Sequence, residues 1–304
     1  MVLWWAGLGL EARAMQQHVD TAFQPSVTIP TYVVGTGPLV LVDEAHNNAR
    51  ALDSAYRPFA EVLRQDGYRT DALREPPSAR ALQHASVLVI INPLHDTNVD
   101  NWTLPTPSAF STAEIAAIRA WVEDGGSVLL VGDHMPFAGA AAALAEALGF
   151  EFMNGFAIDT SAWEPLVFRR GDRSLASHPI TEGRGGAERV DSVATFWGLA
   201  FRPLDPGATP LMTLGRGVIS YNPLEAWRFN PDTPSPPVDG WLQGAARGLG
   251  AGRVVVLGEA GMLSAHVSGP NRVPVGMNAP VASQNQQFVL NVMHWLSRGW
   301  PVGH

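Results

Sequence analysis

The pattern of hydrophobic and polar positions alternates between short apolar runs and segments with helical spacing. Four runs are continuously apolar and are bounded by glycines or polar clusters, which is typical of strands buried on both faces. These runs cover residues 38–42, 86–91, 127–131 and 253–257. Helices are expected over residues 56–63, 115–122, 138–148 and 289–296. Strands that alternate with helices predict an α/β fold with a mostly parallel, doubly wound sheet and right-handed crossovers.

Residues 151–250 differ from the rest of the chain in composition and in hydrophobic periodicity. Prolines, glycines and tryptophans are frequent there, helical periodicity is absent, and only short apolar runs occur. Such a segment favours short strands and long loops over helices. We therefore expect a single α/β domain over residues 38–304 that carries a β-rich insertion at about 151–250.

Residues 1–37 are expected to form a lead-in to this domain. Residues 2–10 are apolar, but the stretch is too short to span a bilayer and lacks the basic region of a secretory signal. Two interpretations stay open for it: the remnant of a signal or anchor, and an N-terminal segment packed on the domain. No other stretch of the sequence approaches a membrane span.

Each expected strand ends in polar or titratable side chains. Because the carboxyl ends of parallel strands lie on one edge of a sheet, these side chains are predicted to converge in one crevice. In chain order the groups are Asp43, Glu44 and His46; Asn92, His95 and Asp96; Asp133 and His134; and Glu259.

A mixture of carboxylates and imidazoles predicts a divalent metal ion that activates water or polarises a carbonyl. We expect Asp43, His46 and Asp133 to hold the ion. Zinc or manganese suits a mixed set of ligands, and calcium suits a set dominated by oxygen atoms. Glu44, His134 and Glu259 are the expected catalytic residues. The alternative for each residue is a structural role, in which it caps a helix or satisfies loop amides.

Composition removes several classes of chemistry. The chain contains no cysteine, which excludes thiol nucleophiles, disulfides and zinc–thiolate sites. All 20 basic residues are arginines, so a phosphate-loop lysine and a Schiff-base lysine are also excluded. The net charge of -8 and the lack of a basic stripe argue against nucleic acid as a partner.

Other reaction types have weaker support. No G-x-S-x-G elbow occurs, and Ser264, the serine best placed for a triad, lacks flanking glycines. No glycine-rich phosphate loop follows the first strand. Glycosidase chemistry needs only two carboxylates, which Glu44 could supply together with Asp133 or Glu259.

Several motifs carry a resemblance to a known superfamily. Asp66, Gly67 and Tyr68 follow the first helix, and the sequence WVEDGG precedes the central strand at 121–126. Together with the strand order, these resemble the class I glutamine-amidotransferase-like superfamily, and the resemblance covers about residues 38–298. The stretch His178-Pro179-Ile180 is similar to a motif of its trehalose-utilisation-like and gliding-motility-associated branches.

The closest resemblance is to an uncharacterised bacterial group with a DEAH-x-N end to the first strand and an ADHMPF central turn. The corresponding stretches here are residues 43–48 and 132–137. The resemblance implies a flavodoxin-like fold, and an exported or periplasmic location, with the cytoplasm as the alternative. One departure is decisive for chemistry: true amidotransferases carry a cysteine at the central turn, where this chain has Asp133 and His134. Glutamine hydrolysis through a thioester is therefore excluded.

These observations lead to a hypothesis about function. We expect a metal-dependent hydrolase of a small ester, lactone or amide, with no nucleic-acid partner and no membrane span. Four tryptophans of the insertion are expected to wall the crevice or to join the core: Trp163, Trp197, Trp227 and Trp241. The rival hypothesis is a non-catalytic domain of the cell envelope that binds a sugar or peptide.

Overall fold

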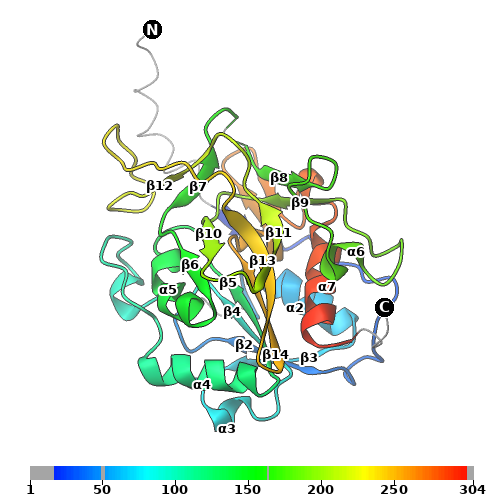
Figure 1. Ribbon diagram of the computed structural model, residues 1–304. Helices are drawn as coiled ribbons and strands as arrows, with labels where there is room; N and C mark the ends of the chain where they lie inside the picture. Colours follow the sequence, from blue (N-terminus) through cyan, green and yellow to red (C-terminus); the bar gives the residue numbers. More distant parts are fainter. Residues whose placement is uncertain (1–16, 49–51, 163, 300–304) are drawn as a thin grey trace.

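The computed structural model describes residues 17–48, 52–162 and 164–299. Its main element is a nine-stranded sheet with the order β3-β2-β4-β5-β14-β13-β10-β6, in which β11 also pairs with β13 (Figure 1). Five neighbouring strands run parallel: β3 (Arg69–Leu73), β2 (Leu39–Asp43), β4 (Val87–Ile91), β5 (Ser127–Val131) and β14 (Gly252–Leu257).

The remaining four strands of this sheet are antiparallel to their neighbours. They are β6 (Phe150–Phe152), β10 (Phe201–Pro203), β11 (Ala208–Thr213) and β13 (Leu242–Leu249). The α/β class predicted from the sequence is confirmed, but the sheet is mixed rather than mostly parallel. The reason is that the expected insertion does not stand apart: its strands extend the parallel sheet beyond β14.

Helices cover both faces of the sheet. On one face, α2 (Arg57–Gln65) and α7 (Asn285–Leu296) bury their apolar sides in one hydrophobic cluster. On the other face, α3 (Ala79–Leu82), α4 (Thr112–Glu123) and α5 (Phe137–Ala147) bury theirs in a second cluster. Figure 1 shows α2 beside α7 and α4 near α5. The short helix α6 (Pro179–Glu182) packs against α7.

Three smaller sheets and three short 3-10 helices complete the regular secondary structure of the described residues. The sheets are β1 (Gln17–Val19) with β15 (Ala265–Ser268) and β16 (Val273–Gly276), β7 (Phe156–Asp159) with β12 (Val218–Tyr221), and β8 (Leu166–Arg169) with β9 (Ser192–Thr195). The 3-10 helices are η1 (Asp96–Asn98), η2 (Gly261–Leu263) and η3 (Pro280–Ala282).

None of the helices in the described residues is long and apolar enough to cross a bilayer. The apolar stretch at residues 2–10, on which the expectation of export depends, lies outside the described residues.

Candidate functional site

The centre of the site lies at the carboxyl ends of three neighbouring parallel strands. The pairing registers of β4, β5 and β14 align the last residues of these strands with one another. Asn92 follows β4 directly, and Asp133 and Glu259 each follow one residue further on after β5 and β14. Three polar side chains that are distant in sequence therefore meet at the middle of the sheet edge.

Glu259 is the most deeply buried of the three, with 1% of its surface exposed. Its carboxylate accepts hydrogen bonds from the backbone amides of Gly261, at 2.5 Å, and Met262, at 2.9 Å, at the start of η2. The inserted segment covers it from the other side, where the amide of Phe196 also donates to the carboxylate. A glycine is needed at 198, since a Cβ there would lie 1.8 Å from the carbonyl oxygen of Gly258.

Asp133 is partly exposed, and three donors surround its carboxylate. The backbone amide of His134 lies 2.8 Å from its Oδ1. The side-chain amide of Asn92 and the backbone amide of Ala260 also donate to it. Asp133 thus links the buried Glu259 to the outside of the molecule.

The two carboxyl groups influence each other's ionisation. Burial, and then the negative charge of Asp133, raise the pKa of Glu259 to about 8. Burial also raises the pKa of Asp133, against the opposing effect of His134. Two carboxyl groups that share a buried site do not both ionise readily, and Glu259, with a pKa of about 8, keeps its proton at neutral pH.

Tyr56 and Asn92 form a polar bridge next to this pair. Asn92 Nδ2 donates to the hydroxyl of Tyr56 at 3.0 Å. Asn92 has a left-handed backbone with φ 48°, a conformation that asparagine tolerates better than most residues. Burial and the charges of Asp133 and Glu259 raise the pKa of Tyr56. The Tyr56 hydroxyl therefore keeps its proton, and no acceptor for that proton is found among the described residues.

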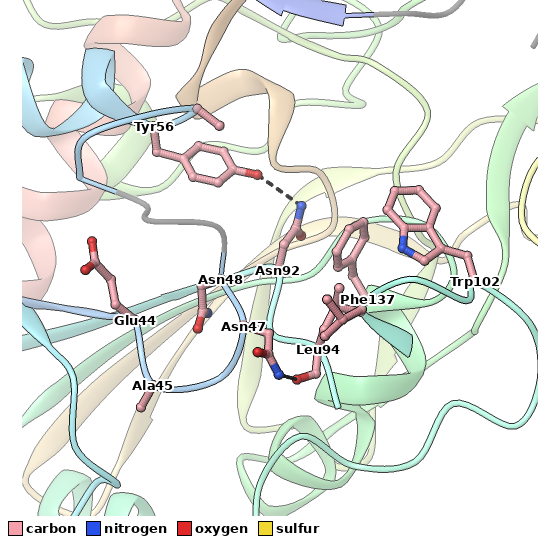
Figure 2. A pocket seen from close by; sticks show the side chains of 11 residues that line it. Glu44, Ala45, Asn47, Asn48, Tyr56, Asn92, Leu94, Trp102 and Phe137 are labelled. Atoms are coloured by element: carbon pink, nitrogen blue, oxygen red, sulfur yellow. Dashed lines mark hydrogen bonds between the residues drawn. The ribbon is translucent and has the colours of Figure 1, made fainter. Parts of the chain in front are cut away.

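A cavity of about 530 Å³ opens beside the bridge. Figure 2 shows Glu44 and Asn48 on one side with Tyr56 above them, Trp102 and Phe137 on the other side, and Asn92 between the two sides, where it meets the Tyr56 hydroxyl. The other described lining residues are Ala45, Asn47, Ala55, Leu94 and Val99. The cavity therefore has a polar end and an aromatic end, with the hydrogen-bonding bridge in the middle.

His134 lies in an aromatic enclosure and is 9% exposed. Its Nδ1 donates to the backbone carbonyl of Met135 at 2.7 Å, so that nitrogen carries the proton. The ring stacks on Phe156 with 4.4 Å between centroids and meets the edge of Trp227 at 4.6 Å. Its Nε2 makes no hydrogen bond to a described residue.

The aromatic end of the cavity separates it from His134. The ring centroids of Phe137 and Trp102 lie 5.7 Å and 6.1 Å from that of His134. The loop that carries Trp102 is tied to the insertion by two backbone hydrogen bonds of 2.9 Å, from Leu104 to Leu224 and from Ala226 to Trp102. The insertion therefore holds the aromatic wall in place.

A second polar cluster lies at the end of β2, away from the carboxyl pair. His46 Nδ1 lies 2.9 Å from both oxygens of Asp43, and its Nε2 lies 3.1 Å from Oε1 of Glu114. Burial lowers the pKa of His46, but the two carboxylates outweigh that effect and the pKa is raised. Glu114 also caps α4, because its carboxylate accepts from the amide of Ser111 at 2.7 Å.

The structure does not bring together the expected metal ligands Asp43, His46 and Asp133. Both ring nitrogens of His46 are already engaged by Asp43 and Glu114, while Asp133 is engaged by Asn92 and backbone amides. Within residues 17–48, 52–162 and 164–299, no group of three or more histidines and acids is arranged to hold a metal ion.

Strand alternation explains part of this separation. Successive side chains of a strand point to opposite faces of the sheet, and Asp43, the last residue of β2, shares the parity of Leu41, which packs on the face covered by α4. Asp133 and Glu259 follow the ends of β5 and β14, and Asn92 and backbone amides hold their carboxyl groups instead.

Glu44, an expected catalytic residue, lines the cavity rather than joining the carboxyl pair. Its Oε1 accepts from the amide of Leu52 at 3.3 Å, and its Oε2 lies 3.3 Å from Nε of Arg74. The expected catalytic residues are thus spread over three places: Glu44 in the cavity, Glu259 in the pair, and His134 behind the aromatic wall.

Two residues of the site have no chemical role in the sequence analysis. Tyr56 enters there only as the first residue of the helix expected over 56–63, and Asn92 only as one of the polar groups at strand ends. A local signal existed for Tyr56: Pro58 favours the first turn of a helix, so the helix begins at Arg57 and Tyr56 is its N-cap. From there the phenol reaches the sheet edge instead of the helix face.

The four tryptophans of the insertion have different roles. Trp197 and Trp227 pack in the aromatic cluster that surrounds His134 and Phe156. Trp241 packs against the main core, with the guanidinium of Arg202 over its ring at 4.8 Å. Trp163 lies outside the described residues.

Comparison with known proteins gives similarity in structure only. No family model and no curated protein matches the chain. The mmIFT52 N-terminal domain has a TM-score of 0.59 at 13% identity, covering 87% of this chain and 99% of that one. A cytoplasmic protein of Salmonella typhimurium LT2 has a TM-score of 0.50 at 14% identity, with coverages of 85% and 98%. A ThuA-like protein of Bacteroides uniformis ATCC 8492 has a TM-score of 0.46 at 13% identity, with coverages of 90% and 94%.

The assignment to an uncharacterised group with DEAH-x-N and ADHMPF motifs is therefore wrong. No family model supports it, and the similarities at 13–14% identity concern the fold alone. The first motif has a local explanation: Asn48 Oδ1 accepts from the amide of His46 at 3.0 Å, and its Nδ2 donates to Ile91 at 2.9 Å. These bonds shape the loop after β2.

Proposed function

We propose that the chain is a hydrolase of a small ester, lactone or amide that uses Asp133 and Glu259 as a proton-sharing pair. The observation that carries the proposal is the position of the two carboxyl groups. They lie at the ends of neighbouring strands, and Asn92 connects Asp133 to a cavity large enough for a small substrate.

In this proposal Asp133 is the general base. It is the partly exposed member of the pair, and its surrounding donors favour the charged form. It takes a proton from a water molecule while the water oxygen attacks the substrate carbonyl. It then returns the proton to the leaving oxygen or nitrogen as that bond breaks. General acid–base help of this kind contributes about 10²–10⁴-fold to a rate.

Glu259 and Tyr56 have supporting roles in the same scheme. Glu259 stays protonated near neutral pH, which limits the pair to one negative charge. The Tyr56 hydroxyl accepts from Asn92 and has its own proton available for the oxygen of the carbonyl. A donor placed at the developing oxyanion typically contributes about 10²–10³-fold.

The metal-dependent form of the hypothesis does not fit the described residues. The ligand set expected for the ion is divided between two clusters, Asp43 with His46 and Glu114, and Asp133 with Asn92 and Glu259, and both nitrogens of His46 are engaged. No step of the proposed reaction therefore passes through a metal.

A ligand-binding domain without catalysis is the second candidate. The combination of an aromatic wall with three asparagines and a glutamate along one cavity supports it. In that case the cavity binds its ligand, and Asp133 contributes nothing to turnover.

Hydrolysis of a panel of small esters, lactones and amides tests the proposal. We expect turnover by the wild-type protein, unchanged by EDTA, and a loss of about 10²–10⁴-fold in kcat for Asp133→Asn. Asp232→Asn, at an exposed loop position, is the matched control and should keep full activity. Binding without turnover, with Asp133→Asn unchanged, would support the ligand-binding domain, and a loss of turnover in EDTA would favour the metal-dependent form.

A further inference from the structure

The two ends of the cavity differ in the groups that they offer a ligand. One end presents the Glu44 carboxylate and the Asn48 amide, and the other presents the rings of Trp102 and Phe137 (Figure 2). The Tyr56–Asn92 bridge lies between the two ends. A substrate whose carbonyl reaches the bridge therefore has one substituent near a carboxylate and the other against aromatic rings.

The polar end carries negative charge. Glu44 is the only acidic residue among the described lining residues, and 7% of its side chain is exposed. Its partner Arg74 lies outside the lining, makes one contact at 3.3 Å and is 68% exposed, so solvent screens its charge strongly. At the rim, the Asn47 amide donates to a further carboxylate, Asp96, at 2.9 Å.

The carboxyl pair behind the bridge brings no positive charge to the cavity, because neither Asp133 nor Glu259 has an arginine partner among the described residues. A cavity lined by a carboxylate and low-dielectric rings attracts cations and repels anions. Aromatic faces also attract a cation or an apolar ring more strongly than they attract an anion.

We propose that the substrate is an aminoacyl amide or ester with an apolar leaving group. Its protonated amine pairs with Glu44, its carbonyl oxygen meets the Tyr56 hydroxyl, and the leaving group packs against Trp102 and Phe137. This assignment rests on the proposed hydrolase function. In the reaction, water adds its oxygen to the carbonyl carbon, the bond to the leaving group breaks, and a free amino acid and an amine or alcohol are released. No oxidant or reductant is needed.

Three para-nitroanilides that differ in charge test the inference: alanyl, which is cationic, propionyl, which is neutral, and succinyl, which is anionic. Binding is measured by calorimetry at pH 7, and turnover by the absorbance of released para-nitroaniline. We expect the alanyl compound to bind about 10-fold more tightly than the propionyl compound, with the succinyl compound weakest. Glu44→Gln should reduce the preference for the alanyl compound to about 2-fold or less.

Two control variants separate charge recognition from general damage. Glu123→Gln removes an exposed carboxylate of α4 and should keep the full preference. Trp102→Ala should weaken binding of all three compounds and leave their order unchanged, because all three carry the same leaving group. Circular dichroism and thermal melting of each variant establish that it is folded.

The outcomes for the two proposals are distinct. The charge assignment is overturned if the alanyl and propionyl compounds bind equally or if the succinyl compound binds best. In that case, turnover of any of the three compounds still supports the hydrolase. Preferential binding of the alanyl compound with no turnover of any anilide or matching ester supports the charge assignment and overturns the hydrolase. A preference that persists in folded Glu44→Gln assigns the selection to another group and overturns the role of Glu44.

Discussion

Two polar clusters at the same edge of the sheet show how differently similar residues can behave. At the end of β2, Asp43 and Glu114 enclose His46, and both ring nitrogens are engaged. At the ends of β5 and β14, Asp133 and Glu259 face each other with amides around them and no cationic partner in the described residues. The first cluster balances its charge and joins a strand to a helix. The second keeps an unbalanced, proton-sharing pair beside a cavity, which is the arrangement that chemistry requires.

The largest effect is expected for Tyr56, next to the second cluster, where a substitution should lower activity and leave stability almost unchanged. Tyr56→Phe removes the donor proposed for the oxyanion and should lower kcat by about 10²-fold with little effect on folding. Tyr68→Phe is a matched control, because Tyr68 is also a buried phenol, bonds to Ser297 at 2.8 Å and to Tyr32, follows the other end of α2, and does not line the cavity. Steady-state kinetics and urea unfolding of both variants check the prediction. Equal activity in the two variants would contradict it.

The first cluster should respond in the opposite way. His46→Ala leaves the fully buried side chain of Asp43 without its imidazole partner, and removal of one partner of a buried polar pair costs about 3 kcal/mol. We expect a corresponding fall in the free energy of unfolding in urea, and no change in kcat below the denaturation midpoint. His84→Ala, at an exposed position, provides the control. A folded His46→Ala protein with wild-type stability and no activity would reverse the roles of the two clusters.

The third prediction concerns the dependence of stability on pH. The folded pKa of Glu259, about 8, lies above its ordinary value of 4.5, so between these values the native state binds more protons than the unfolded state. The stabilising contribution is complete below about pH 4.5 and is lost as the pH rises through about 8. The slope amounts to about 1.4 kcal/mol per pH unit for one proton. Glu259→Gln should flatten the wild-type decline between pH 5 and pH 8 in urea titrations; an unchanged slope would remove Glu259 as its source.

Much of the parallel core could be predicted, because its strands are continuous apolar runs. The strand β3 was not predicted, because its sequence, RTDAL, is that of a half-exposed edge strand with alternating polar residues. The insertion was expected as a β-rich segment, but nothing in its short runs indicated that four strands would pair with the core sheet. Long-range strand pairing depends on tertiary contacts that local periodicity does not contain.

The sequence predicts that the candidate site lies at the edge of the sheet, but it does not predict which side chains meet there. Asp133 and Glu259 were correctly placed at strand ends, whereas Asp43 and His46 were assigned to the same crevice without regard to which face each side chain takes. Counting alternate residues from Val42 and Val131 separates Asp43 from Asp133, but His46 lies in the loop after β2, where strand alternation does not predict its direction. The pairing of His46 with Glu114, a residue 68 positions away, could not have been read from the strand pattern.

The stacking of Phe156 on His134 has a consequence for how this protein can change. Phe156 belongs to β7, whose partner is β12, and this two-stranded unit is not part of the nine-stranded sheet. Substitutions in β7 or β12 can therefore alter the packing around the imidazole without changing the strands that position Asp133 and Glu259.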